Sequence, residues 1–143
     1  MQDSASDFHL DLRLEGDTLP VGNLFLSRVL LMNDTRYPWV IAVPRRAGLI
    51  EIIDLSEDER EQFWREVDIL ARCVKSMHPH AKLNVGALGN VVKQLHFHIV
   101  ARHTADAAWP GPVWGHGART PYDADGGARL VAQFQKALRH ELT

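Results

Sequence analysis

The chain has 143 residues, 45% of them apolar, with 16 basic and 18 acidic side chains and a formal charge of −2. This length and composition predict one ordinary globular domain over residues 1–143, and the single cysteine, Cys73, excludes an intrachain disulfide. The balanced charge argues against a nucleic-acid partner, which requires clustered Lys and Arg, and the apolar runs fall far short of the ~20 residues of a membrane span.

The chain begins with a polar, acidic segment, residues 1–7, which is unlike a secretory leader, so we expect a cytoplasmic protein. The first predicted strand covers residues 24–32, which are rich in Leu and Val. A polar turn at 33–36 leads to a second strand at 39–43, ended by Pro44. So short a connection predicts that the two strands pair antiparallel.

A helix is predicted from Ser56, which forms a capping box with Glu59, to about Met77, because Pro79 disfavours helical geometry just before it. Strands are predicted at 82–86 and 91–102, with a Gly-containing loop at 86–90 between them, and the Trp-, Pro- and Gly-rich segment 109–117 reads as a loop. Apolar residues at helical spacing then predict a C-terminal helix: Leu130, Val131, Phe134, Ala137 and Leu138. This order predicts an α+β fold with an antiparallel sheet, one main helix and a C-terminal helix.

The segment that carries chemistry is the alternating stretch 94–100. Its polar members, Gln94, His96 and His98, are expected on one face of a strand about 7 Å apart, with apolar side chains on the other face. Neutral imidazole is a nucleophile at pH 7, so one ring could attack phosphorus while the next contacts phosphate oxygens or assists the leaving group. Two histidines on a solvent-facing strand surface without a role are the plainer alternative. A metal site is a third, although zinc needs three or four ligands and the sequence offers no further ligand nearby.

The loop before this row supports the phosphate interpretation. Residues 84–93 combine Asn84, Gly86, Gly89 and Asn90, and glycine lets backbone amides approach a phosphate closely. A plain hairpin turn explains such a loop equally well when it is considered alone. Next to the histidine row, it predicts a phosphate cradle beside a nucleophile.

Taken together, these residues resemble the histidine triad (HIT) superfamily of nucleotide hydrolases and transferases, in its Hint-like and Fhit-like branches. Asn84 and Gly86 match the family's Asn-x-Gly, residues 89–93 stand where its Gly-Gln stretch belongs, and Arg102 follows the row as in many members. The triad itself reads Gln-Leu-His-Phe-His-Ile-Val over 94–100. The resemblance covers residues 24–102 and leaves 103–143 as a C-terminal loop and helix.

The resemblance implies that His96 attacks the α-phosphorus of a nucleoside phosphate derivative and forms a covalent nucleotidyl-histidine, which water resolves. The candidate substrates are phosphoramidates and dinucleoside polyphosphates. In relatives a strand carbonyl accepts from the other ring nitrogen of this histidine. His98 would contact the phosphate and help the leaving group. The implied binding residues are Asn84, Gly89 and Asn90 for phosphate and leaving group, and Asn33 or Asp34 for ribose. No cofactor is expected beyond Mg²⁺ carried by the substrate phosphates.

Three departures from the family pattern stand out. Gln94 replaces the first histidine and cannot titrate, Asn90 replaces a longer Gln, and Trp39 stands where the family carries a supporting fourth histidine. Gln94 and Trp39 favour an alternative function, a nucleotide-binding protein with little or no turnover. Trp109, in the loop 109–117, is a candidate wall of the substrate pocket, or else packs on its own domain or a partner copy.

A homodimer is expected for two reasons. Most members of the resembled branches pair through the helix and an edge strand. In addition, the tryptophans of the loop 109–117 and the Phe63–Trp64 pair give more apolar surface than one small domain easily covers.

Overall fold

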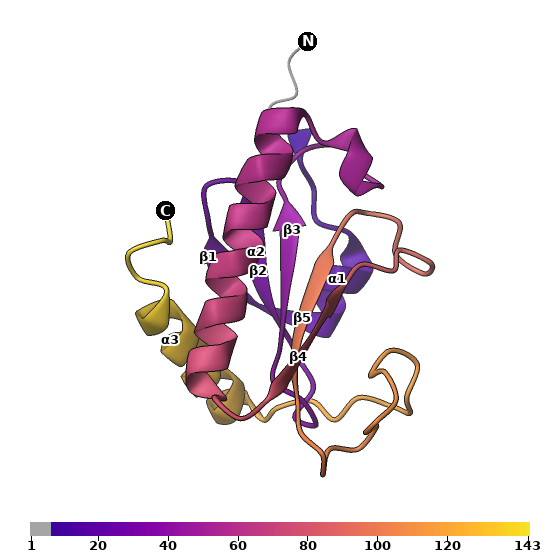
Figure 1. Cartoon of the computed structure of the whole chain (residues 1–143), viewed down its shortest axis with the longest axis vertical. Coiled ribbons are helices and arrows are strands. Elements are labelled where there is room, and N and C mark those ends of the chain that lie inside the picture. Colours follow the sequence, from indigo (N-terminus) through magenta and orange to yellow (C-terminus); the bar gives the residue numbers. More distant parts are fainter. Residues whose placement is uncertain (1–6) are drawn as a thin grey trace.

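The computed structural model describes residues 7–143 and contains a five-stranded sheet with the strand order β1-β2-β3-β5-β4, every neighbouring pair antiparallel (Figure 1). The predicted α+β fold with an antiparallel sheet is therefore confirmed. Of the polar N-terminal segment, residues 1–7, only residue 7 lies among the described residues. The expectation drawn from that segment therefore falls outside them. The elements in chain order are α1 (Leu12–Asp17), β1 (Thr18–Asn23), β2 (Ser27–Met32), β3 (Trp39–Pro44), η2 (Ile52–Asp54), α2 (Glu57–Met77), β4 (Lys82–Gly86), β5 (Phe97–Arg102) and α3 (Ala124–Ala137).

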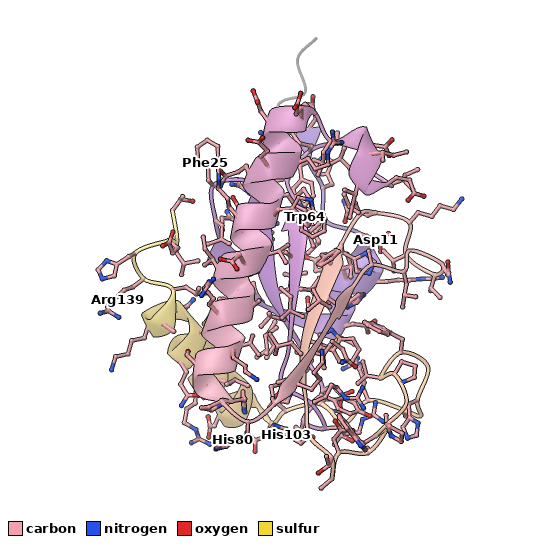
Figure 2. The ribbon with its side chains drawn as sticks, in the orientation of Figure 1. Asp11, Phe25, Trp64, His80, His103 and Arg139 are labelled. Carbon is pink, nitrogen blue, oxygen red and sulfur yellow. The ribbon has the colours of Figure 1, made fainter. Side chains whose placement is uncertain are left out.

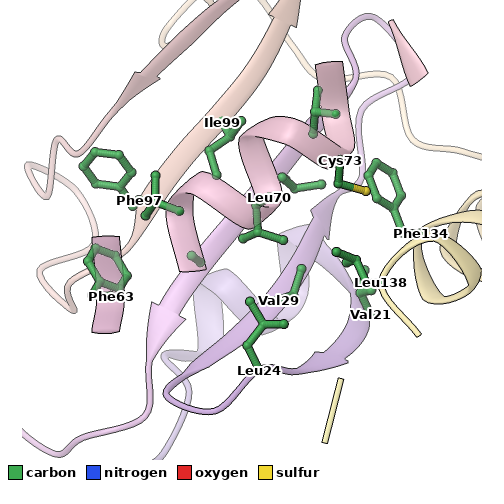
Figure 3. Packing of buried hydrophobic residues seen from close by; sticks show 14 of the residues in the cluster. Val21, Leu24, Val29, Phe63, Leu70, Cys73, Phe97, Ile99, Phe134 and Leu138 are labelled. Carbon is green, nitrogen blue, oxygen red and sulfur yellow. The ribbon is translucent and has the colours of Figure 1, made fainter. Parts of the chain in front are cut away.

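The helix α2 crosses one face of the sheet, and α3 lies beside it (Figure 1). The helix α2 begins as the sequence predicts. The Ser56 hydroxyl accepts from the amide of Glu59, and the Glu59 side chain accepts from the Ser56 amide. Its apolar stripe packs on strand residues and on α3 (Figure 3), through Phe63, Val67, Leu70, Cys73 and Val74. No helix within residues 7–143 is long and apolar enough to cross a membrane.

The opposite face of the sheet is also covered, so the plainer alternative of two histidines on a solvent-facing strand surface does not apply. A second apolar cluster fills it, with Leu30, Tyr37, Trp39, Ile41, Val43, Val100 and Val113 among its members. Side chains of α1 and of the loop after β5 complete this layer. Both faces of the strands that position the site are therefore shielded from water.

Two boundaries differ from the sequence prediction. The strand expected at 91–102 begins only at Phe97, because the amide of Leu95 donates to the carbonyl of Leu49 and the residues before it run as a loop. The strand expected from residue 24 begins at Ser27, and α1 and β1 precede it. The sequence does not predict β1 because Pro20 and Gly22 are unusual within a strand. Pro20 is tolerated there because β1 is an edge strand.

Candidate functional site

Two buried imidazoles lie side by side where β5 begins. His96 directly precedes the strand and His98 is its second residue, and each is 6% exposed. Their ring centroids are 4.8 Å apart and the rings are inclined at 73°. The fold therefore brings together the two histidines that the sequence predicts to act together, and it buries most of both side chains.

The hydrogen bonds of His96 define which of its nitrogens is available. Its Nδ1 lies 2.6 Å from the backbone carbonyl oxygen of Gln94. A carbonyl oxygen only accepts, so Nδ1 carries the proton and donates. In the neutral ring, Nε2 then keeps its lone pair, which is the state required of a nucleophile.

His98 is held in the opposite state. The indole Nε1–H of Trp39 donates to His98 Nδ1 across 3.0 Å. An indole nitrogen only donates, so Nδ1 is the acceptor and the neutral ring carries its proton on Nε2. Burial, followed by the neighbouring His96, lowers the pKa of His98 to about 3. His98 is therefore neutral at physiological pH and presents an N–H donor.

Both histidines border a cavity of about 600 Å³ between β3, β5 and the two loops that flank them. The loop 87–92 contributes Gly89 and Asn90, and the loop after β5 contributes Val113 and Trp114. Gly89 has φ +75°, a left-handed conformation that favours glycine at this bend. The remaining wall is largely apolar, with Leu14, Met32, Trp39, Ile41, Val91 and Val92.

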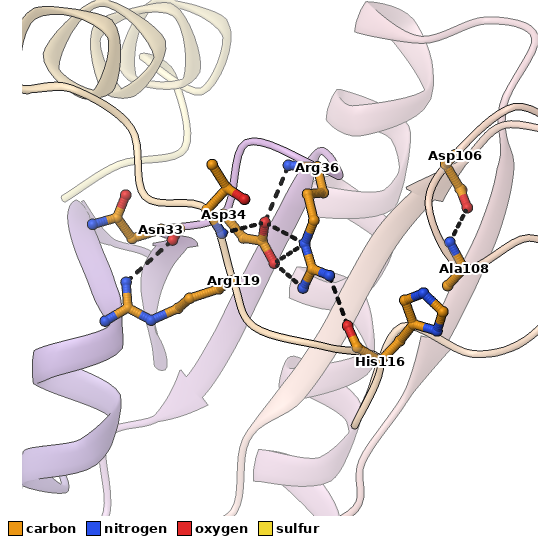
Figure 4. Close-up of polar contacts among 8 residues, drawn as sticks. Asn33, Asp34, Arg36, Asp106, Ala108, His116 and Arg119 are labelled. Atoms are coloured by element: carbon orange, nitrogen blue, oxygen red, sulfur yellow. Dashed lines mark hydrogen bonds and ion pairs between the residues drawn. The ribbon is translucent and has the colours of Figure 1, made fainter.

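The far side of the cavity carries an ion pair (Figure 4). Asp34 is 0% exposed, and its carboxylate accepts from Arg36 Nε and Nη2 at 3.0 and 2.9 Å and from the amide of Thr120 at 3.2 Å. Burial opposes ionisation, but the hydrogen bonds from Arg36 and Thr120 win, so the pKa of Asp34 lies below its ordinary value. The Asp34 carboxylate is thus already hydrogen-bonded to groups of the protein, although Asp34 borders the cavity where the resemblance implies a ribose site.

Four of the predicted site residues do not border this cavity. The Gln94 side chain turns to the N-terminal segment, where it accepts from the amide of Asp11 and donates to the carbonyl of His9, both at 2.8 Å. The part of Gln94 that contacts His96 is its backbone carbonyl. Asn33 accepts from the amide of Tyr122 at 2.8 Å.

The other two are held by one buried side chain, Arg102. Its Nη1 donates to Asn84 Oδ1 at 2.8 Å, and its guanidinium carbon lies 5.6 Å from the centre of the Trp109 ring. Asn84 and Trp109 thus support the sheet end and the following loop. The structure brings together His96, His98, Gly89, Asn90 and Asp34, and places Gln94, Asn33, Asn84 and Trp109 around them.

Sequence reasoning did not assign two tryptophans to the site. Trp39 and Trp114 contact His98 edge-on, at centroid distances of 5.6 and 5.3 Å. Trp114 belongs to the same loop, 109–117, as the predicted Trp109, and it is Trp114 that borders the cavity. Trp39 was noted only as a missing histidine, although an indole can donate the hydrogen bond that such a histidine would offer.

The structure offers little for the metal alternative. Within residues 7–143 no group of three or more His, Cys, Asp or Glu side chains is placed to hold a metal ion. His96 and His98 would supply two ligands where zinc needs three or four.

Comparison with known proteins gave one family match. The sequence model of the HIT domain matches residues 13–105, which span α1 to the end of β5. No curated protein matched.

Three solved structures are similar over nearly the whole chain. A histidine triad (HIT) protein from Sinorhizobium meliloti 1021 is 40% identical with a TM-score of 0.91, covering 94% of this chain and 100% of its own. One from Bradyrhizobium japonicum is 43% identical with a TM-score of 0.86, covering 95% and 98%. One from Marinobacter aquaeolei VT8 is 41% identical with a TM-score of 0.90, covering 94% and 98%.

Proposed function

The chain belongs to the histidine triad (HIT) domain family, and from this premise we propose that it cleaves nucleoside phosphate derivatives through a covalent nucleotidyl-His96 intermediate. The observation that carries the proposal is the pair of opposite hydrogen-bonding states in adjacent rings. His96 offers a lone pair on Nε2, and His98 offers an N–H donor 4.8 Å away between ring centres. Nucleotidyl transfer requires a nucleophile that attacks the α-phosphorus and a hydrogen-bond donor to the oxygens of the phosphate under attack.

The rest of the cavity fits a nucleotide. Its volume of about 600 Å³ falls within the ~300–1,000 Å³ range of small-molecule sites. The apolar wall, including Leu14, Met32 and Ile41, offers a surface for a base. Gly89 and Asn90 border the same cavity as the two histidines and are the residues that we expect to contact the phosphates. Mg²⁺ enters only with the substrate phosphates in this scheme, and no nucleic-acid partner is proposed.

Detection of the covalent intermediate tests the proposal. The protein is mixed with a panel of adenylated compounds and quenched in base, in which phosphohistidine-type bonds survive. We expect a mass increase of one adenylyl group, located on His96 by peptide mapping, together with release of AMP. Release of AMP without any adduct from a rapid quench, or an adduct on another residue, would contradict the mechanism.

The second candidate is a nucleotide-binding protein with little or no turnover. It is favoured by Gln94, whose side chain turns away from the histidines, and by Trp39, whose indole N–H occupies Nδ1 of His98. Saturable AMP binding in the calorimeter, with no AMP released from any compound of the panel, would support this candidate over the enzyme.

Replacement of Gln94 distinguishes a relay role from a supporting one. We expect Gln94→His to change kcat by less than about tenfold, or ~1.4 kcal/mol, because only the Gln94 carbonyl contacts His96 and that carbonyl remains in the variant. The measurement is the pH–rate profile of both proteins. A larger gain with a new limb near the histidine pKa of ~6.5 would show that the first triad position relays a proton.

We also propose that the protein is a homodimer. Within residues 7–143, β4 is an edge strand with no partner on its outer side, and nearby Val85 and Trp64 are each 44% exposed. Figure 2 shows Trp64 on the flank of α2, where its ring packs edge-on against Phe97. Less apolar surface is exposed than the sequence predicts, because Phe63 is fully buried and Trp114 packs against Trp39.

Light scattering at micromolar concentration should therefore give a dimer mass, and Trp64→Glu should give a monomer that keeps the natural far-UV spectrum. The charge would have to be buried in the interface, which is strongly unfavourable. A matched control is Phe25→Glu, since Phe25 is 73% exposed in the turn between β1 and β2, on the opposite side of the sheet from β4. A monomeric natural protein would refute the proposal.

A further inference from the structure

Trp39 is the first residue of β3, and it reaches His98 on the adjacent strand β5. The residue is 4% exposed, and the bond from its Nε1 to His98 Nδ1 measures 3.0 Å. Edge-on contacts with Tyr37 and Trp114 fix the indole from two further sides. The donor is therefore oriented by packing, and it does not depend on a mobile surface group.

This bond decides what His98 can do with a proton. To act as a general acid, an imidazole must first gain a second proton, here on Nδ1. Nδ1 already accepts a hydrogen bond from the indole N–H of Trp39, which has no acceptor to offer. Protonation of Nδ1 would therefore place two N–H groups opposite each other and break this hydrogen bond. The proton on Nε2 belongs to the neutral ring and is far too weakly acidic to be released at neutral pH.

Among residues 7–143, no other group around His98 replaces the missing acid. Its strand neighbours are Ile41 on β3 and Gly86 on β4, and the titratable side chain against it is His96, the nucleophile. The charged side chains bordering the cavity form two ion pairs, Asp34 with Arg36 and Asp17 with Arg119. An ionised carboxylate or a guanidinium is no proton donor near pH 7.

We propose that Trp39 is a positioning residue that sets leaving-group selectivity, by confining His98 to a hydrogen-bond donor and so restricting turnover to groups that depart as stable anions. This inference rests on the proposed function. The substrates it favours are anhydrides of a nucleoside monophosphate with a phosphate or a carboxylate. Phosphoramidates, whose nitrogen must be protonated before it leaves, are disfavoured.

The bonds balance without an added acid. The Nε2 lone pair of His96 forms a bond to the α-phosphorus while the bond from phosphorus to the leaving oxygen breaks, and the electron pair leaves with that oxygen as an anion. Water then attacks phosphorus and the phosphorus–nitrogen bond breaks, returning the pair to Nε2. The proton lost by water passes to solvent, and His96 Nδ1 keeps its proton on the Gln94 carbonyl throughout.

The test uses adenosine 5′-phosphate esters of phenols of graded acidity, together with adenosine 5′-phosphoramidate. For the natural protein we expect kcat/KM to fall about tenfold for each unit increase in the pKa of the departing phenol, as for departure without proton donation, and the phosphoramidate to react slowest. In Trp39→His, whose imidazole can accept as well as donate, the dependence should become shallower and an acid limb should appear in the pH–rate profile. The gain should be largest for the phosphoramidate.

Trp114→Phe is the matched control, because it alters the aromatic wall on the same ring but leaves the Trp39 bond in place. It should shift all rates by a similar factor and leave the leaving-group dependence unchanged. A second readout needs no turnover: ¹⁵N NMR of His98 should show an accepting Nδ1 and a protonated Nε2 from neutral to mildly acid pH. In Trp39→Phe, which removes the donor and keeps a ring, the Nδ1 resonance should move.

Three kinetic results would each overturn the inference: a flat leaving-group dependence in the natural protein, a phosphoramidate that reacts as fast as the best ester, or equal leaving-group dependence in the natural protein and in Trp39→His. A His98 resonance unaffected by Trp39→Phe would also do so. Failure of the proposed function is distinct, because it would be seen as the absence of AMP release from every compound, including the best ester.

Discussion

His96→Ala should abolish nucleotidyl transfer and leave the fold intact. Removing the nucleophile removes the covalent route, so we expect kcat to fall by on the order of 10⁴-fold or more. The fold should survive because His96 precedes β5 and borders an existing cavity, and its backbone is not altered. Steady-state AMP release measures the first effect, and urea unfolding measures the second, for which we expect a loss of about 1–2 kcal/mol.

His80→Ala provides the control, since His80 is exposed just beyond the far end of α2 (Figure 2) and should lose neither activity nor stability. Retention of more than a tenth of the natural rate in His96→Ala would contradict the mechanism. If His96→Ala does not fold, its inactivity says nothing about nucleophilic attack. His96→Gln, which is closer in size, then provides the test, and the mechanism requires the same loss of activity in a folded protein.

The parts of the fold that the sequence predicts well are those with local signals. The capping box at Ser56 and the proline after Met77 bound α2 at the residues expected. The strand at Lys82–Gly86 and the strand from Trp39 are likewise bounded by turns and by Pro44. These signals act within a few residues, so no tertiary information is needed to interpret them.

The parts that could not be predicted depend on distant partners. The alternation at 94–100 correctly places His96 and His98 on one face, but the solvent exposure of that face depends on which segments cover it. The cover comes from α1 and from the loop after β5, and the key hydrogen bond joins Trp39 to His98 across 59 residues. No pattern around either residue specifies this contact.

The positions of Asn84 and Trp109 outside the cavity are explained by Arg102. This side chain is 2% exposed, and arginines are almost never that buried unless paired. Its partner is Asp106, and the two together organise the end of β5 and hold Asn84 and Trp109. Because nothing in the sequence marks Arg102 as buried, Asn84 and Trp109 seemed free for a substrate.

Asp106→Asn should therefore cause the largest loss of stability that we expect from one substitution. The Asp106 carboxylate accepts from Arg102 Nε and Nη2 at 2.7 and 2.9 Å, and from the amides of His103 and Trp109 at 3.1 and 2.9 Å. The variant leaves a buried guanidinium without its counter-charge, which costs about 3–5 kcal/mol. Urea unfolding at pH 7 measures the change in the free energy of unfolding.

The pH dependence of that loss separates the ion pair from simple packing. The hydrogen bond from Arg102 is the main cause that lowers the pKa of Asp106 to about 2, below the ~3.9 of an unfolded aspartate. A lowered folded pKa stabilises the protein fully above the unfolded value and loses this effect as pH falls through about 4 towards 2. The gap between the natural protein and Asp106→Asn should therefore narrow by about 2 kcal/mol over that interval. Asp68→Asn, which breaks an exposed pair with Arg72, should show neither effect, because both partners remain solvated. A gap of constant size down to pH 2 would mean that Asp106 acts through its shape and its amide contacts rather than through its charge.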